Sequence, residues 1–140
     1  MIYIGNDHAG FCLKETIIKH LQSKKIIYKD CGCFSEQSCD YPDIAKVVCR
    51  SFSDFRNDKA ILICGTGVGM SIVANRFPEI RAVCASDCFS VRFSRLHNDS
   101  NVLCIGARVI GEGLAIEILD IFLNTDFEGG RHKRRVDKIN

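Results

Sequence analysis

The sequence has no long apolar run and little net charge, and these absences limit what the chain can be. No run of about eighteen apolar residues is present, and no signal peptide is visible. We therefore expect a soluble, cytoplasmic protein with no membrane partner. The formal net charge is only +2, which is too small to indicate a polyanionic partner. Basic residues interleaved with aromatic ones are also missing, so no nucleic-acid partner is expected.

Paired Cys-x-x-Cys motifs are missing as well, although the chain has nine cysteines. The candidate metal ligands are Cys31, Cys33, Cys39 and His8. Their single Cys-x-Cys pair has no second pair to match it, so no metal is expected. The odd count and the missing secretory signal argue against a disulfide framework. Because Cys12, Cys49 and Cys104 fall at apolar positions of expected helices or strands, we expect most cysteines to fill the core.

Strand-like apolar runs alternate with helical patterns, which is typical of a parallel sheet covered on both faces. The expected strands are Met1–Ile4, Lys25–Lys29, Ala60–Cys64, Ile80–Cys84 and Val102–Ile105. The expected helices are Phe11–Ser23, Pro42–Phe52, Gly69–Phe77, Cys88–Leu96, Gly111–Leu123 and a short one from Arg131. A length of 140 residues suits a single domain spanning 1–140. We predict an α/β fold with a five-stranded, doubly wound parallel sheet, and we take the strand order to be 2-1-3-4-5.

A glycine-rich segment after the third expected strand carries the main chemical signal. Residues 64–69 read Cys-Gly-Thr-Gly-Val-Gly and precede a helical stretch. Successive N–H groups and a helix N-terminus attract negative charge, and the same field favours the thiolate form of Cys64. The alternative is that Cys64 is an inert buried cysteine. The sequence thus predicts a base or nucleophile beside an oxyanion pocket.

The loop after the first expected strand is predicted to share that pocket. In a doubly wound sheet, ligands bind outside the carboxyl ends of neighbouring strands whose connections diverge to opposite faces. Strands one and three are neighbours in the expected order. Asp7 and His8 of the segment 5–10 should therefore open on the same crevice as Cys64.

His97 and Asn98 follow the fourth expected helix, so they belong at the opposite end of the sheet from Cys64. A catalytic His97 would then reach the Cys64 of a second subunit. We predict a two-fold homodimer with an intersubunit active site, with a tetramer left open. The alternative is that His97 only interacts with the last carbonyl groups of its helix.

A dinucleotide-binding fold is a rival interpretation, because glycine loops after strands also bind pyrophosphate. Here the spacing is Gly-x-Gly-x-Gly, it follows the third strand rather than the first, and no room remains for a substrate domain. No nucleotide or other cofactor is therefore expected.

Six motifs in order give the chain a resemblance to a known family. They are Asp7-His8-Ala9-Gly10, Asp40-Tyr41-Pro42, Cys64-Gly65-Thr66-Gly67-Val68-Gly69, Ser94-Arg95 with His97-Asn98, Gly106-Ala107-Arg108-Val109, and Glu128-Gly129-Gly130-Arg131-His132. Nearly end to end, the chain resembles the type B ribose-5-phosphate isomerases and the related galactose-6-phosphate isomerase subunits. The resemblance implies a Rossmann-like three-layer sandwich, a dimer, no metal, and interconversion of an aldose phosphate with a ketose phosphate.

The chemistry of such an isomerisation matches the residues. A proton moves from C2 to C1 through an enediolate, which requires a base, oxyanion stabilisation and opening of the sugar ring. Cys64 is the expected base, N–H groups of Gly65, Gly67 and Gly69 stabilise the oxyanion, and Thr66 passes a proton between oxygens. One subgroup of the family uses a glutamate at the position of Met70 and lacks the cysteine. The presence of Cys64 favours the thiol here.

The remaining roles depend more on the resemblance. It places an acid–base pair at His97 and Asn98, so His97 is expected to protonate the ring oxygen with help from Asp7. Tyr41 either meets the substrate or caps the helix that follows. The phosphate requires cationic donors, and Arg131 and Arg135 lie four residues apart on one helical face. His8 and Arg108 are the other family positions for this task. A solvated basic tail is the alternative.

Ribose 5-phosphate is the expected substrate, because one chain carries the full set of site residues. The galactose branch divides its residues between two chains. A hexose 6-phosphate, such as galactose or allose 6-phosphate, and a non-catalytic sugar-phosphate-binding subunit remain as alternatives.

Overall fold

One sheet of five parallel strands, in the order β2-β1-β3-β5-β4, organises the chain. The computed structural model describes residues 1–139. The strands are β1 (Ile2–Asn6), β2 (Tyr28–Asp30), β3 (Lys59–Cys64), β4 (Ala82–Cys84) and β5 (Val102–Gly106). The helices are η1 (His8–Gly10), α1 (Phe11–Ser23), α2 (Tyr41–Arg50), α3 (Val68–Ala74), α4 (Cys88–Asn98), α5 (Glu112–Asn124) and α6 (Arg131–Val136). In this part of the chain, no helix is long and apolar enough to cross a bilayer.

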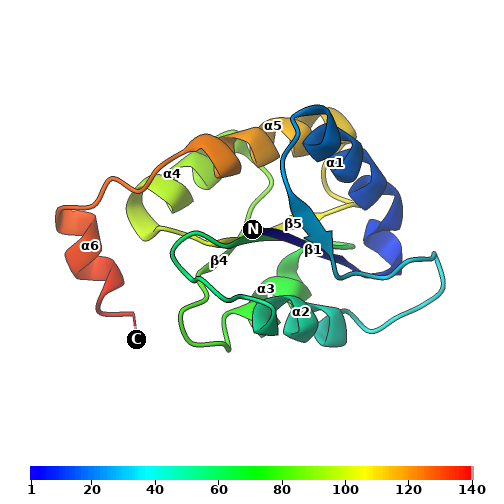
Figure 1. Ribbon diagram of the computed structural model, residues 1–140, viewed down its shortest axis with the longest axis horizontal. Helices are drawn as coiled ribbons and strands as arrows, with labels where there is room; N and C mark the ends of the chain where they lie inside the picture. Colours follow the sequence, from blue (N-terminus) through cyan, green and yellow to red (C-terminus); the bar gives the residue numbers. More distant parts are fainter. Residues whose placement is uncertain (140) are drawn as a thin grey trace.

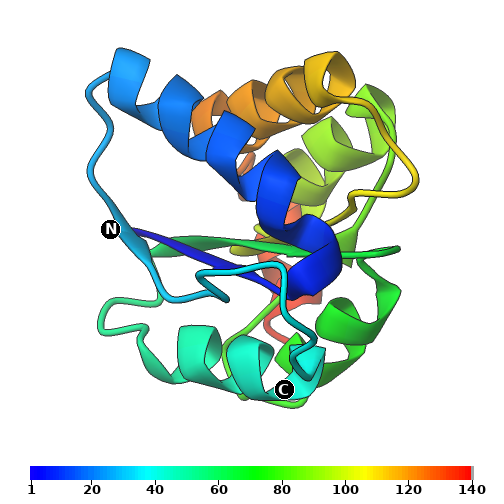
Figure 2. The ribbon, with the colours of Figure 1, turned by 90° about the vertical axis from the view of Figure 1, so that its right-hand side faces the viewer.

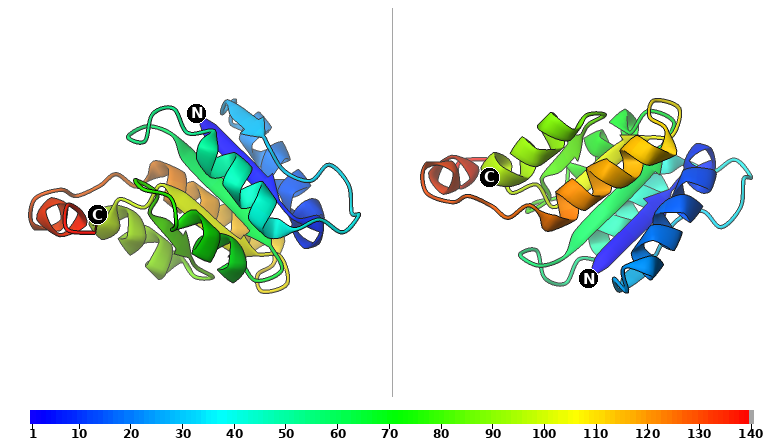
Figure 3. Two further views of the ribbon diagram at one scale, coloured as in Figure 1. Left: turned by 90° about the horizontal axis from the view of Figure 1, so that it is seen from below. Right: turned by 90° about the horizontal axis from the view of Figure 1, so that it is seen from above.

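Helices cover both faces of the sheet, which confirms the predicted three-layer α/β architecture (Figures 1 and 2). Side chains alternate along a strand, so β3 contributes Ile61 and Ile63 to one apolar cluster with α1, α4 and α5. Its other residues, Ala60, Leu62 and Cys64, join a second cluster with α2 and α3. Figure 3 shows α2 and α3 on the lower face and α1, α4 and α5 on the upper one.

The predicted strand order 2-1-3-4-5 is wrong at its last two positions. β5 lies between β3 and β4, and β4 forms the edge. All five residues of β5 are buried, whereas β4 has only three residues and Cys84 at its end is exposed. The longer apolar strand therefore takes the central position, where both of its faces are covered. As a result, Gly106 pairs with Cys64, and the segment after β5 lies beside the glycine loop.

The expectation that most cysteines fill the core is also wrong. Cys49, Cys64 and Cys104 are buried, but Cys12 and Cys84 are exposed. On α1, the residues Leu13, Ile17 and Leu21 face the core. Cys12 lies outside this row of positions and therefore faces solvent. Cys33 and Cys39 form a disulfide within the irregular segment between β2 and α2. Since a disulfide-bonded sulfur carries no free thiolate, these two residues do not form the metal site weighed from the sequence.

A buried lysine fastens that irregular segment to the upper helical layer. Lys14 of α1 is 1% exposed, and its Nζ lies 2.9 Å from a carboxylate oxygen of Asp30. The same ammonium group donates a hydrogen bond to the carbonyl oxygen of Cys33 at 2.7 Å. A buried charge is tolerated only when it is paired and hydrogen-bonded in this way.

Replacing Lys14 with alanine is therefore expected to lower the free energy of unfolding by about 2–4 kcal/mol, because Asp30 and the Cys33 carbonyl lose their partner. Urea denaturation followed by circular dichroism measures the change. Lys19→Ala, at an exposed position of the same helix, serves as the matched control and should change stability by less than about 0.5 kcal/mol. Equal losses in the two variants would contradict this explanation.

Candidate active site

The glycine loop begins where β3 ends and holds the sulfur of Cys64 by a main-chain contact. The N–H of Gly67 donates to Cys64 Sγ at 3.1 Å. Gly67 has φ of 80°, a left-handed conformation in which a side chain is strained. Gly106 is equally constrained, because a Cβ there would lie 2.8 Å from the backbone of Thr66. The loop therefore packs directly on β5, and an N–H donor points at the sulfur.

Cys84 supports the same loop from the end of β4. Although Cys84 is exposed, partial desolvation of its sulfur, together with the neighbouring Cys64, raises its pKa, so this residue remains a thiol at neutral pH. Its Sγ donates to the carbonyl oxygen of Thr66 at 3.7 Å. Thr66 itself is exposed, and its Oγ1 accepts a hydrogen bond from the N–H of Val68 at 3.3 Å. The Thr66 hydroxyl is thus fixed at the mouth of the loop.

The segment after β1 lies next to this loop, as the sequence predicted. The N–H of Asp7 donates to the carbonyl oxygen of Ile63, one residue before Cys64, at 3.0 Å. The Asp7 side chain is 7% exposed, and its Oδ1 accepts the N–H of Gly10 at 3.1 Å. His8 is half-buried, and its Nδ1 accepts the N–H of Cys39 at 3.5 Å. After β1 the chain turns to the upper helices, and after β3 it turns to the lower ones, and ligands of doubly wound sheets bind where neighbouring connections diverge in this way.

Two further predicted residues lie against the glycine loop. The ring of Tyr41 lies against Gly69, where a Cβ would be 2.7 Å from Tyr41 Cε2. Arg108 follows β5, and its guanidinium lies 3.5 Å from the position that a Cβ on Gly65 would take. The Arg108 N–H also donates to the carbonyl oxygen of Gly65 at 3.1 Å. Because β5 neighbours β3, Arg108 is close to Cys64, which the predicted strand order would not have allowed.

His97, Asn98, Arg131 and Arg135 lie at the other end of the sheet. His97 and Asn98 close α4 just before β5, and β5 then runs from Val102, which pairs with Ala60, to Gly106, which pairs with Cys64. Four residues of strand separate these pairs by roughly 13 Å. Figures 1 and 3 place α6 beyond α4 at one end of the molecule, and the segment 31–40 at the opposite end. The four residues therefore do not meet the Cys64 loop of their own chain.

At that end, His97 belongs to a cluster of titratable side chains. Its ring stacks on that of His132 with centroids 3.9 Å apart and an interplanar angle of 7°. Glu128 Oε2 lies 3.6 Å from His97 Nε2 and 3.2 Å from His132 Nε2. Burial, the His97 ring and Arg131 lower the pKa of His132, which favours its neutral form. The cluster ties the ring of His97 to α6, the helix that also carries Arg131 and Arg135.

The same three residues are the metal-ligand candidate among the residues described, since their ligand atoms lie within 4.8 Å of one another. Their geometry fits an ion poorly. In-plane lone pairs of two parallel, stacked rings run side by side instead of converging on one point. Arg131 Nε also donates to His132 Nε2 at 3.4 Å and occupies that lone pair.

Sequence reasoning assigned no role to His132, to Lys14 or to the Cys33–Cys39 pair. The one available signal for His132 was its place in the Gly-Gly-Arg-His motif. Two cavities, of about 530 and 430 Å³, also lie away from the Cys64 loop. The larger one is lined by Arg56, Arg81, Asp99 and Lys133 among others.

Comparisons with known proteins identify the family of this chain. A family described as Ribose/Galactose Isomerase matches residues 2–139. The chain is 47% identical to ribose-5-phosphate isomerase B of Escherichia coli over 138 residues, which cover 99% of this chain and 93% of that protein. A ribose 5-phosphate isomerase from Thermotoga maritima superposes with a TM-score of 0.94 at 48% identity, covering 99% and 95% of the two chains.

A third relative was solved with a ligand. Ribose-5-phosphate isomerase B from Mycoplasma genitalium, with bound ribulose-5-phosphate, superposes with a TM-score of 0.93 at 39% identity and covers 99% of this chain and 92% of its own. The family match spans almost the entire chain, and the fold is shared throughout. This chain therefore belongs to the ribose/galactose isomerase family.

Proposed function

We propose that the protein is an aldose–ketose isomerase that interconverts ribose 5-phosphate and ribulose 5-phosphate. The observation that carries the proposal is that Cys64, with an N–H donor on its sulfur, ends β3 beside the segment that carries Asp7 and His8, at the carboxyl ends of β1 and β3. Two relatives, at 47% and 43% identity, are ribose-5-phosphate isomerases B, and a related structure holds ribulose-5-phosphate. Both observations support this substrate.

In the proposed mechanism, Cys64 acts as the base. The thiolate removes the proton from C2, and an enediolate forms with negative charge on its oxygens. The N–H of Gly67 stabilises the thiolate at 3.1 Å, and other N–H groups of the loop 65–69 stabilise the oxyanion. Thr66, exposed at the loop mouth, passes a proton between O1 and O2. Return of the proton from Cys64 to C1 completes the transfer and regenerates the thiolate.

We propose that the working unit is a homodimer and that each site is completed by the second subunit. The support is that His97, Asn98, Arg131 and Arg135 share one end of the molecule, away from the Cys64 loop. In this arrangement His97 of one subunit protonates the ring oxygen of a sugar held at the other subunit's Cys64, with Asp7 at the hydroxyl.

Seven cysteines carry free thiols, which supports a reducing compartment such as the cytoplasm.

The phosphate group is proposed to bind Arg131 and Arg135 from one subunit and His8 and Arg108 from the other. Both α6 arginines are exposed and lie one helical turn apart. Guanidinium groups bind phosphate through paired hydrogen bonds. Because both side chains are exposed, their guanidinium N–H groups are available to an anion.

Arg135→Ala is expected to raise KM for ribose 5-phosphate about 10- to 100-fold, since a charge-assisted contact is lost, with little change in kcat. Steady-state kinetics measures both constants. Arg134→Ala removes the same charge from the neighbouring position of α6 and should change KM less than about threefold. An equal rise in KM for the two variants would mean that only the overall charge of the helix matters.

The proposal is tested by assaying the purified chain with ribose 5-phosphate, galactose 6-phosphate and allose 6-phosphate, with and without a chelator. We expect turnover of the pentose phosphate that the chelator leaves unchanged. Preference for a hexose 6-phosphate would favour the other branch of the family. Binding without turnover of any sugar would identify a non-catalytic subunit, and loss of turnover in the chelator would overturn the thiol mechanism.

A further inference from the structure

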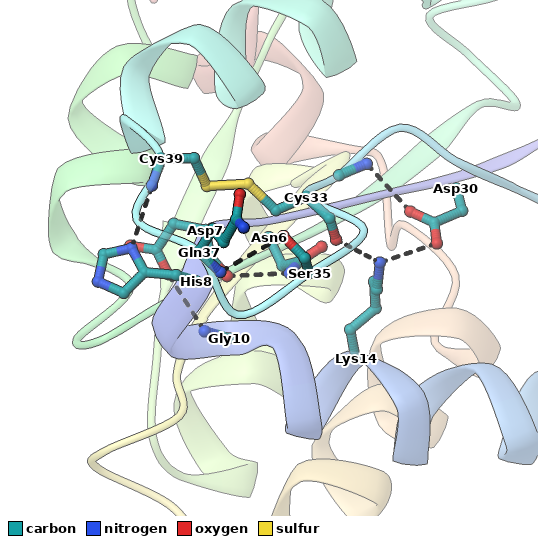
Figure 4. The surroundings of a disulfide bond; sticks show 11 residues. Asn6, Asp7, His8, Gly10, Lys14, Asp30, Cys33, Ser35, Gln37 and Cys39 are labelled. Atoms are coloured by element: carbon teal, nitrogen blue, oxygen red, sulfur yellow. Dashed lines mark hydrogen bonds and ion pairs between the residues drawn. A yellow bond between two sulfur atoms is a disulfide. The ribbon is translucent and has the colours of Figure 1, made fainter.

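The segment 31–40 is fixed firmly at one end, next to the candidate active site. Cys33 donates its N–H to the carbonyl oxygen of Asn6 at 3.1 Å and accepts a hydrogen bond from Lys14 Nζ at 2.7 Å (Figure 4). Gly32 donates to Asp30 Oδ1 at 3.0 Å. Asn6 and Lys14 are both fully buried. Cys33 is therefore attached to the rigid part of the molecule.

The other end of the segment contacts the site itself. Cys39 donates its N–H to His8 Nδ1 at 3.5 Å, and two residues later Tyr41 lies against Gly69 of the glycine loop. The intervening residues 34–38 are all exposed and make few contacts with the rest of the chain. Cys39 is therefore held on its C-terminal side by the start of α2, and on its N-terminal side by its disulfide, since residues 34–38 add little.

The Cys33–Cys39 disulfide is the covalent link between these two ends. Both residues are only partly buried, so a small thiol reagent can reach them. In an otherwise thiol-rich chain, this one bond joins the anchored end to the end that contacts His8. Disulfides in reducing compartments are typically transient and regulatory.

We propose that Cys33 and Cys39 are a reversible thiol–disulfide pair that adjusts substrate affinity by positioning His8. The inference rests on the proposed function, in which His8 binds the sugar phosphate. With the disulfide closed, the Cys39 N–H is held at His8 Nδ1. A ring nitrogen that accepts a hydrogen bond from an N–H carries no proton of its own, so the neutral His8 ring has its proton on Nε2. That N–H then faces the substrate as a ready donor.

Opening the bond removes this preorganisation. Cys39 is then held only from its C-terminal side, where α2 begins at Tyr41, because residues 34–38 are exposed, and the N–H contact that fixes the His8 ring weakens. Binding the sugar phosphate must then order the segment and the ring together, which lowers affinity. The chemical step at Cys64 is unaffected, because its sulfur is held by Gly67 and not by this segment.

The redox step is an exchange with a low-molecular-weight disulfide. Oxidised glutathione takes two electrons from the two thiols of Cys33 and Cys39. Its own S–S bond breaks and it leaves as two glutathione thiols, which carry away the two thiol protons. One S–S bond forms in the protein, so electrons and protons balance. A thiol reductant reverses the exchange.

The test compares the full-length protein after treatment with oxidised glutathione and after full reduction, with peptide mass spectrometry to verify the bond. Formation of the bond removes two hydrogens from the peptide that contains both cysteines. We expect KM for ribose 5-phosphate to be about fivefold lower in the oxidised form, with kcat unchanged within about twofold. The double variant Cys33→Ser with Cys39→Ser should keep the higher KM under both conditions, and Cys88→Ser, at the start of α4, should respond like the parent protein.

Equal KM values for the verified disulfide and dithiol forms would overturn the inference, and so would failure of the pair to oxidise while an isomerase activity is present. A fall in kcat with added glutathione mass on the Cys64 peptide would instead locate the redox effect at the base and also count against it. The absence of isomerase activity in every form would refute the proposed function, and the readouts therefore separate the two hypotheses.

Discussion

Replacing Cys64 with serine is expected to lower kcat for ribose 5-phosphate isomerisation by about 10³-fold while changing KM less than about threefold. A serine hydroxyl has nearly the same shape, so the Gly67 N–H contact at 3.1 Å and the turn of the loop are retained. Its proton, however, is lost far less readily than that of a thiol. Proton abstraction from C2 should therefore fail while the sugar phosphate still binds.

The measurement is a coupled assay of kcat and KM, combined with exchange of the C2 hydrogen into deuterated water. Titration calorimetry with ribulose 5-phosphate verifies that binding survives. Cys12→Ser, which replaces an exposed cysteine on α1, is the matched control and should leave both constants unchanged. A Cys64→Ser variant with its kcat intact would exclude the thiol as base and return Cys64 to a packing role.

Much of the fold was predictable from local pattern, because each element carries its own signal. α1 matches its predicted range Phe11–Ser23, and Pro42 marks the start of α2 correctly. Strand order depends on non-local competition instead. β5 outcompetes β4 for the central position because all of its residues are buried and its neighbours cover both faces. Local pattern does not decide this competition, because 80–84 and 102–105 are strand-like runs of similar length in the sequence.

The site was predictable to the extent that motifs at the carboxyl ends of neighbouring strands must meet. Asp7, His8 and Cys64 do lie together for that reason. The Cys33–Cys39 link was not predictable, because nine cysteines allow many pairings and spacing alone does not select one. The burial of Lys14 was equally hidden. It depends on Asp30 and on a carbonyl group of an irregular segment, whose path no periodic pattern describes.

The division of the site residues between two ends of one chain makes a specific prediction about mixed dimers. Cys64→Ser and His97→Asn should each be nearly inactive alone. In a dimer that contains one subunit of each kind, the site with the intact Cys64 receives the intact His97 of the other subunit. Random mixing makes half of the dimers mixed, with one competent site of two, so activity should return to about a quarter of the parent value.

The experiment requires dissociation and reassociation, or coexpression with two different tags, and native mass spectrometry to verify that mixed dimers form. A matched control combines Cys64→Ser with Thr66→Ala. These two residues belong to the same loop, so each site of that mixed dimer keeps one defect and activity should stay low. Complete lack of recovery in verified Cys64→Ser/His97→Asn dimers would place His97 and Cys64 in the same subunit's site, or remove His97 from catalysis. If activity recovers in the Cys64→Ser/His97→Asn mixture but not in the control mixture, each active site must contain residues of two chains. Only a site shared between subunits can bring an intact thiol and an intact imidazole to one sugar.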